Sequence, residues 1–220
     1  MGSKKSGDTQ NTKQKRKHLR LILIILIIGG TIWAYDEFVK YRIFPKRFGV
    51  VEEGVLYRSG QISAAVIKKT LQKHNIGVII MMSGDDPQNY DKQTEKKVAE
   101  ELGIDLYNFP LGGNGTGDVN NYLKSLLTIY QAKQERKPVL VHCSAGAQRT
   151  GGVVVLYRFF FQKKDADFVL KELKKYGWKY KSNPYLPAFL NENMPYLAEK
   201  LVEEGVISEI PSPLPKLPTP

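Results

Sequence analysis

Short apolar runs alternate with longer amphipathic segments over most of the chain beyond residue 48. The runs at 106–110 and 138–141 have the length and composition of buried strands. Segments with helical periodicity lie between and after such runs, at residues 63–75, 91–102, 119–127 and 165–176. Because predicted strands alternate with predicted helices, we expect an α/β domain whose central, mostly parallel sheet is flanked by helices on both faces.

A short loop follows the strand at 138–141 and leads directly into an apolar helix over 151–161. A tight loop between a strand and a helix gathers backbone N–H groups at the helix N-terminus, where the helix dipole also favours negative charge. The run from His142 to Gly151 therefore predicts an anion-binding site.

Cys143 and Arg149 stand at the two ends of that loop. Loop amides, the helix dipole and a guanidinium group all favour a thiolate, which is the nucleophilic form of cysteine. The planar fork of Arg149 matches two oxygens of a phosphate. Cys143 is therefore predicted to attack phosphorus and carry the phosphoryl group covalently. Arginine and the amides supply the charge stabilisation, so we expect neither a metal nor another cofactor.

The pattern His142-Cys143, five residues, Arg149-Thr150 resembles the signature of the cysteine-dependent protein tyrosine phosphatases. This resemblance implies that Cys143 is the nucleophile and that Arg149 binds phosphate. It also implies that Thr150 bonds the thiolate and that His142 supports the loop structurally. The residues implied to line the phosphate site are Ser144, Ala145, Gly146, Ala147, Gln148 and Arg149.

Two further segments, 54–61 and 76–82, resemble the first strands of compact bacterial, plant and fungal members of the dual-specificity branch. The resemblance implies a protein tyrosine phosphatase-like fold and a catalytic domain over 48–205. Within the first segment, we expect Arg58 to be a structural residue held in a salt bridge.

The leaving oxygen needs a proton from a general acid. The resemblance implies that an aspartate on a mobile loop before the signature supplies it. Asp118 is the carboxylate of the glycine-rich segment 111–118. It also stands where the helix at 119–127 needs an N-cap, so the two roles are weighed equally. Asp85 and Asp86 are a second choice, and Asp105, inside a predicted strand, a weaker one.

The five residues of the loop carry no charge. In the family that the signature resembles, members acting on inositol phosphates often carry lysine there, so the resemblance favours phosphoproteins, and phosphotyrosine in particular, over polyphosphorylated inositols. Phosphoserine and phosphothreonine are further candidate substrates. A phosphoinositide or inositol phosphate phosphatase is kept as one alternative. A phosphate-binding module without catalysis is another, and the intact pair of Cys143 and Arg149 disfavours it.

The net charge of +11 is concentrated at the N-terminus, where residues 1–18 are predicted to form a basic, disordered cytoplasmic tail. The uncharged apolar run that follows predicts a transmembrane signal-anchor over 19–36, with a cleaved signal peptide as the alternative. A linker over 37–47 would then lead to a catalytic domain outside the cytoplasm, periplasmic or at the cell surface. With this topology signal, the basic tail is not expected to bind nucleic acid.

The C-terminal segment 206–220 is rich in proline and contains a Pro-x-x-Pro pattern from Pro215 to Pro218. It could serve as a ligand for a partner domain, but a disordered end is the simpler interpretation. The chain has one cysteine, so no internal disulfide can form.

Overall fold

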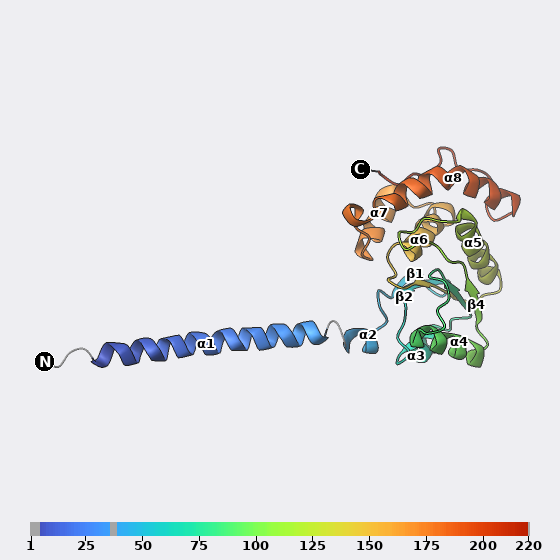
Figure 1. Cartoon of the computed structure of the whole chain (residues 1–220). Coiled ribbons are helices and arrows are strands. Elements are labelled where there is room, and N and C mark those ends of the chain that lie inside the picture. Colours follow the sequence, from blue (N-terminus) through green and yellow to red (C-terminus); the bar gives the residue numbers. More distant parts are fainter. Residues whose placement is uncertain (1–4, 36–38, 220) are drawn as a thin grey trace. The chain divides into compact units, whose positions relative to one another are not determined.

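The computed structural model describes residues 5–35 and 39–219. The chain divides after Ile43 into an N-terminal unit and a larger unit, Phe44–Pro220. The N-terminal unit contains α1 (Lys5–Ala34) and α2 (Lys40–Ile43), shown in blue in Figure 1. Residues 5–18 are helical, which differs from the disordered tail predicted for residues 1–18, and residues 1–4 of that tail lie outside the described part.

The charge-free part of α1 begins at Leu21 and is short. Over residues 21–34 it measures about 21 Å at 1.5 Å per residue, against about 30 Å of hydrocarbon in a bilayer. Within residues 5–35 and 39–219, no helix combines the length and the apolar character that a membrane crossing requires. The anchor predicted over 19–36 is therefore not supported, and its last residue lies outside the described part.

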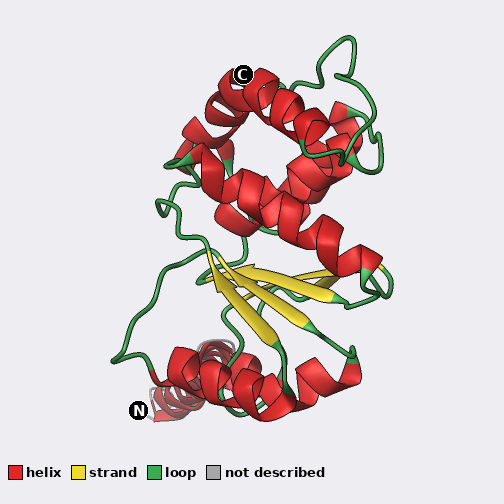
Figure 2. Cartoon of the chain, turned by 90° about the vertical axis from the view of Figure 1, so that its right-hand side faces the viewer, coloured by secondary structure: helices red, strands yellow, loops and turns green. Residues whose placement is uncertain are grey.

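The larger unit is built on one five-stranded sheet in the order β1-β2-β5-β3-β4 (Figures 1 and 2). The four strands β2, β5, β3 and β4 are parallel, which confirms the predicted mostly parallel sheet. An antiparallel edge strand, β1, pairs with β2 and was not predicted. The strands are β1 (Gly49–Glu52), β2 (Leu56–Gly60), β3 (Val78–Met81), β4 (Asp105–Asn108) and β5 (Val139–Cys143).

Helices cover both faces of the sheet, as Figure 2 shows. One face carries α3 (Ile67–Lys73) and α4 (Tyr90–Leu102). The other carries α5 (Val119–Gln134), α6 (Arg149–Phe160), α7 (Ala166–Lys175) and α8 (Tyr185–Glu203), with a short 3-10 helix at Tyr180–Ser182 before α8. Helix α8 was not predicted; it contains Pro195, a residue type that usually ends a helix.

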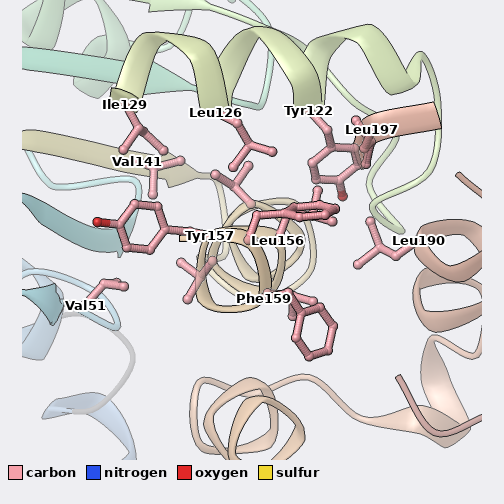
Figure 3. Packing of buried hydrophobic residues seen from close by; sticks show 14 of the residues in the cluster. Val51, Tyr122, Leu126, Ile129, Val141, Leu156, Tyr157, Phe159, Leu190 and Leu197 are labelled. Atoms are coloured by element: carbon pink, nitrogen blue, oxygen red, sulfur yellow. The ribbon is translucent and has the colours of Figure 1, made fainter. Parts of the chain in front are cut away.

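Successive residues of the central strands point to opposite faces and enter two separate cores. In β5, Val139 and Val141 belong to the larger core, whereas Leu140 belongs to the smaller one. The larger core lies where α6 packs between α5 and α8 (Figure 3). Because both faces of the sheet are covered, every residue of β3 and β5 is buried, and all of them except His142 are apolar or cysteine.

The C-terminal segment packs against the larger unit instead of being a disordered end. Leu217 is 2% exposed. Its N–H donates to Asn191 Oδ1 at 2.8 Å, and Asn191 Nδ2 donates to its carbonyl at 2.9 Å. This pair of bonds holds the Pro-x-x-Pro segment on α8, so the pattern is engaged within the chain itself.

Candidate active site

The predicted phosphate-binding residues lie where the parallel strands end. Gly60 at the end of β2 pairs with Cys143, and Met81 at the end of β3 pairs with His142. Cys143 is the last residue of β5, and α6 begins at Arg149. The loop between them, residues 144–148, is called the signature loop below. It occupies the carboxyl edge of the sheet, where open α/β folds bind ligands.

The signature loop curls around the sulfur of Cys143, which is 1% exposed. The amide of Gly146 donates to Cys143 Sγ at 3.1 Å. Gly146 has φ +73°, and a Cβ there would stand 2.4 Å from the amide nitrogen of Gly60. Both constraints require glycine at this position.

The Cys143 thiol is shifted toward its ionised form. Burial by itself raises its pKa, but hydrogen bonds from the hydroxyl and amide of Thr150, the charge of Arg149 and the Gly146 amide outweigh burial and lower the pKa below its usual value. The Thr150 hydroxyl also lies 3.4 Å from the carbonyl oxygen of Ser59. Its single proton bonds either that oxygen or the sulfur, and a thiolate is the stronger acceptor.

Arg149 is the first residue of α6, and its guanidinium lies near Ser144 of the signature loop. Its Nη1 lies 3.5 Å from the carbonyl oxygen of Met82, and its Nη2 lies 3.4 Å from Ser144 Oγ. Both bonds are long and therefore weak. Its Nε has no hydrogen-bond partner among the described residues. The guanidinium thus has donors that a tetrahedral oxyanion can use.

His142 forms a buried pair with a residue that the sequence did not single out. Its Nε2 lies 3.2 Å from Glu95 Oε2, and the two side chains are 0% and 1% exposed. Gln61 Nε2 donates to the same carboxylate oxygen at 3.3 Å. Burial by itself lowers the pKa of His142, but the charge and hydrogen bond of Glu95 outweigh it and raise the pKa. Glu95 is one of several carboxylates on α4, so no sequence signal distinguished it.

Asp118 is the N-cap of α5, which confirms one of its two predicted roles. Its Oδ1 accepts from the amide of Asn120 at 2.9 Å and from the Asn120 side chain at 3.0 Å. The preceding loop is tied down, because Tyr122 donates to the carbonyl of Gly115 at 2.7 Å and Asn183 donates to that of Asn114 at 2.9 Å. Asp118 itself is exposed, and its role as general acid stays a prediction.

Asp105 and Asp85 are less suited than Asp118 to act as the general acid. Asp105 is the first residue of β4, so it lies at the sheet edge opposite Cys143, and it pairs with Lys137 at 3.0 Å. Asp85 follows β3 on the correct edge and pairs with Lys96 at 2.5 Å. The hydrogen bond from Lys96 lowers the pKa of Asp85, which keeps it deprotonated and unsuited to donate a proton.

Arg58 is fully buried in β2 beside the signature loop. Its Nη2 donates to the carbonyl oxygen of Gly146 at 2.7 Å. The predicted salt bridge is therefore replaced by a bond to backbone, together with a ring contact in which the guanidinium carbon lies 3.9 Å from the Tyr176 ring centre. A buried position next to the loop could not be read from the sequence, since it depends on the pairing of β2 with β5.

The sequence resembles dual-specificity phosphatases over part of its length. It is 25% identical over 116 residues to the dual specificity protein phosphatase OPG106 of Vaccinia virus (strain Copenhagen), covering 52% of this chain and 64% of the relative. It is 27% identical over 123 residues to the dual specificity protein phosphatase TpbA of Pseudomonas aeruginosa (strain UCBPP-PA14), covering 56% and 51%. The chain thus spans about half to two thirds of the length of these curated relatives.

The fold matches solved phosphatase structures. The crystal structure of P. aeruginosa TpbA aligns with a TM-score of 0.55 at 22% identity, covering 67% of this chain and 84% of that one. The core catalytic domain of the PP-IP phosphatase SIW14 from S. cerevisiae aligns with a TM-score of 0.56 at 18% identity, covering 71% and 93%. Residues 42–200 match the tyrosine phosphatase family, whose Cys-x5-Arg signature this sheet edge carries at Cys143 and Arg149. The chain belongs to the tyrosine phosphatase family, within the cysteine-dependent protein tyrosine phosphatase superfamily.

Proposed function

We propose that this protein is a phosphatase that hydrolyses phosphate monoesters, with phosphotyrosine in proteins as its main substrate class, through a cysteinyl-phosphate intermediate. One observation carries the proposal. A buried sulfur with a lowered pKa lies 3.1 Å from the Gly146 amide, at the N-terminus of α6 and next to the donors of Arg149.

The chemistry follows from these contacts in two steps. Arg149 and the inward-facing amides of the signature loop bind the phosphate oxygens, and the Cys143 thiolate attacks phosphorus. A sulfur–phosphorus bond forms while the bond to the ester oxygen breaks, and that oxygen takes a proton from the general acid. Water then attacks phosphorus, its proton passes to a base, and the thiolate leaves as inorganic phosphate forms. Thr150 stabilises the departing thiolate by hydrogen bonding.

The charges around the site favour a substrate with a single phosphate group over one with several. The signature loop has no charged side chain. Of the nearby cations, Arg47 donates to the carbonyl of Ala145 at 2.7 Å and Lys92 to that of Gly84 at 2.8 Å. Both therefore have a partner inside the protein. Among the structural neighbours, a TpbA structure contains pTyr, whereas SIW14 is a PP-IP phosphatase and a PTPMT1 structure contains PI(5)P. An inositol phosphate or phosphoinositide is the competing substrate class.

Parallel steady-state assays on the full chain decide between these classes. The substrates are a phosphotyrosyl peptide, a phosphothreonyl peptide, PI(5)P in mixed vesicles and an inositol pyrophosphate, and the measurement is released phosphate. We expect kcat/KM for the phosphotyrosyl peptide to exceed the others by at least about tenfold, which is about 1.4 kcal/mol of transition-state binding. A higher kcat/KM for either inositol compound would overturn the substrate assignment. No release from any substrate would overturn the phosphatase itself.

The role of Asp118 as general acid predicts a dependence on the leaving group. In Asp118→Asn, we expect turnover of phenyl phosphate, a poor leaving group, to fall by about 10²-fold, because an acid contributes most where the leaving oxygen is most basic. Turnover of p-nitrophenyl phosphate should fall much less. Because asparagine also caps helices well, stability should change little. An equal loss on both substrates would leave Asp118 as a cap alone.

The proposed location outside the cytoplasm rests on the charge pattern of the N-terminal sequence. The phosphatase chemistry does not depend on this location, since it uses residues of the larger unit only.

A further inference from the structure

Three successive carbonyl groups of the signature loop accept hydrogen bonds from outside the loop. The amide of Gln61 donates to Ser144 O at 3.2 Å. Arg47 Nη1 donates to Ala145 O at 2.7 Å, and Arg58 Nη2 donates to Gly146 O at 2.7 Å. Two of the three donors are charged, and bonds from charged donors are the stronger kind.

These bonds control the direction of the loop amides. In a trans peptide unit the C=O and the N–H point in opposite directions, so a carbonyl held on the outer side turns its amide inward. The Ala145 carbonyl and the Gly146 amide belong to one peptide unit. Arg47 bonds one end of that unit, and the other end donates to Cys143 Sγ at 3.1 Å. Hydrogen bonds in such a chain polarise one another, which strengthens the amide as a donor.

Arg58 is a positively charged hydrogen-bond donor at neutral pH. Burial lowers its pKa to about 10, although the charge of Glu172 and the Tyr176 and Cys143 groups counteract the burial. The group therefore stays charged. Arg158, a cation that lowers the pKa of Arg58, is itself paired with Glu172 at 2.7 Å.

The turn after α7 packs against both arginines. The Tyr176 ring lies 3.9 Å from the guanidinium carbon of Arg58. The next residue, Gly177, has φ +91°, and a Cβ there would come within 2.8 Å of Arg47 Nε. A side chain at residue 177 would collide with Arg47. The glycine therefore provides the room that the Arg47 guanidinium needs.

We propose that Arg47 and Arg58 are positioning residues of the phosphatase, which hold the carbonyls of Ala145 and Gly146 outward so that the loop amides face the phosphoryl group and the Cys143 sulfur. Neither arginine belongs to the Cys-x5-Arg signature, and neither touches the reacting atoms. The inference rests on the proposed phosphatase activity and is independent of which phosphoester is the substrate.

The test compares donor-deleting and donor-restoring variants in the full chain. Arg47→Met and Arg58→Met keep an apolar stem and remove the donor, while Arg47→Lys and Arg58→Lys restore a positive donor. The first measurement is the pH dependence of iodoacetate alkylation, which reports the thiolate of the single cysteine without any substrate. The second is kcat and KM for p-nitrophenyl phosphate, and the third is inhibition by inorganic phosphate.

We expect each Met variant to raise the apparent pKa of Cys143 and to weaken phosphate inhibition. We expect kcat/KM to fall by about 10- to 100-fold, because losing a hydrogen bond from a charged donor costs about that factor. The Lys variants should recover part of each effect. Two controls separate positioning from stability: exposed Arg136→Lys, and Ile129→Val in the larger core, which should lower Tm without moving the alkylation profile.

A lower Tm in the Met variants, with an unchanged alkylation profile and unchanged phosphate inhibition, would overturn the proposal. Arg47 is only partly buried, so its variants remain informative where those of Arg58 do not fold. A wild type that hydrolyses no phosphoester would count against the proposed function instead. The alkylation profile and phosphate inhibition would still test the arginines in that case.

Discussion

Cys143→Ser is expected to reduce hydrolysis of p-nitrophenyl phosphate by about 10⁴-fold or more, because removal of a covalent nucleophile costs losses of that size. The contacts that lower the pKa of the Cys143 thiol are matched to a thiolate. A serine hydroxyl stays protonated at neutral pH and cannot use them in the same way. The wild type should keep its rate in excess EDTA, because Arg149 and the loop amides supply the charge stabilisation.

The same variant should still bind phosphate. Arg149 and the Gly146 amide are unchanged, and loss of the thiolate removes a negative charge facing the ligand, so inorganic phosphate should bind at least as tightly as in the wild type. Isothermal titration with phosphate or vanadate is the control for an intact site. Residual activity above about 1% of the wild type would mean that another group is the nucleophile.

Glu95→Gln is expected to destabilise the protein by about 3 kcal/mol near pH 6, since removing one partner of a buried ion pair leaves the other uncompensated. The pair is fully enclosed, with Glu95 Oε2 3.2 Å from His142 Nε2. Glutamine preserves the shape of the side chain and can still bond Gln61, so the change isolates the charge. Urea unfolding followed by tryptophan fluorescence measures the loss.

The size of that loss should depend on pH in a definite direction. Glu95 raises the pKa of His142 in the folded protein. A raised pKa stabilises the folded state fully at pH below the ordinary histidine value, and the contribution disappears as pH rises through the folded pKa. The difference between wild type and Glu95→Gln should therefore be larger at pH 6 than at pH 9. A difference that is constant or grows with pH would show that His142 is not the charged partner.

A local pattern of residues was enough to predict the chemical centre. One contiguous segment forms this centre: the strand at 138–141, the loop with Cys143 and Arg149, and the apolar helix that follows. The anion site arises from the strand end, the helix N-terminus and the groups between them, so neighbouring residues in the sequence are enough to predict it. The alternation of such segments with amphipathic helices also predicted the mostly parallel sheet, confirmed in the order β1-β2-β5-β3-β4.

Features that depend on distant segments were missed or mistaken. Helix α8 was missed: it contains Pro195 at an exposed position, while its buried apolar residues pack against α5 and α6. The tail after residue 206 has the composition of a disordered end, yet Asn191 on α8 bonds the backbone of Leu217 twice. The anchor over 19–36 was inferred from hydropathy, but α1 carries too short an apolar stretch among its described residues.

The sequence by itself determined the nucleophile candidate, the phosphate-binding arginine and the strand–loop–helix that joins them, because those residues are neighbours in the chain. Tertiary structure decided what surrounds them. Glu95 pairs with His142, and Arg47 and Arg58 bond the outer side of the signature loop. Each of these partners comes from another element, and charged side chains of this kind are common along the whole chain. The positions of β2 and α4 beside β5 remove Arg58 and Glu95 from water, whereas Arg47 stays partly exposed. Burial is what converts an ordinary charge into a strong and directed interaction.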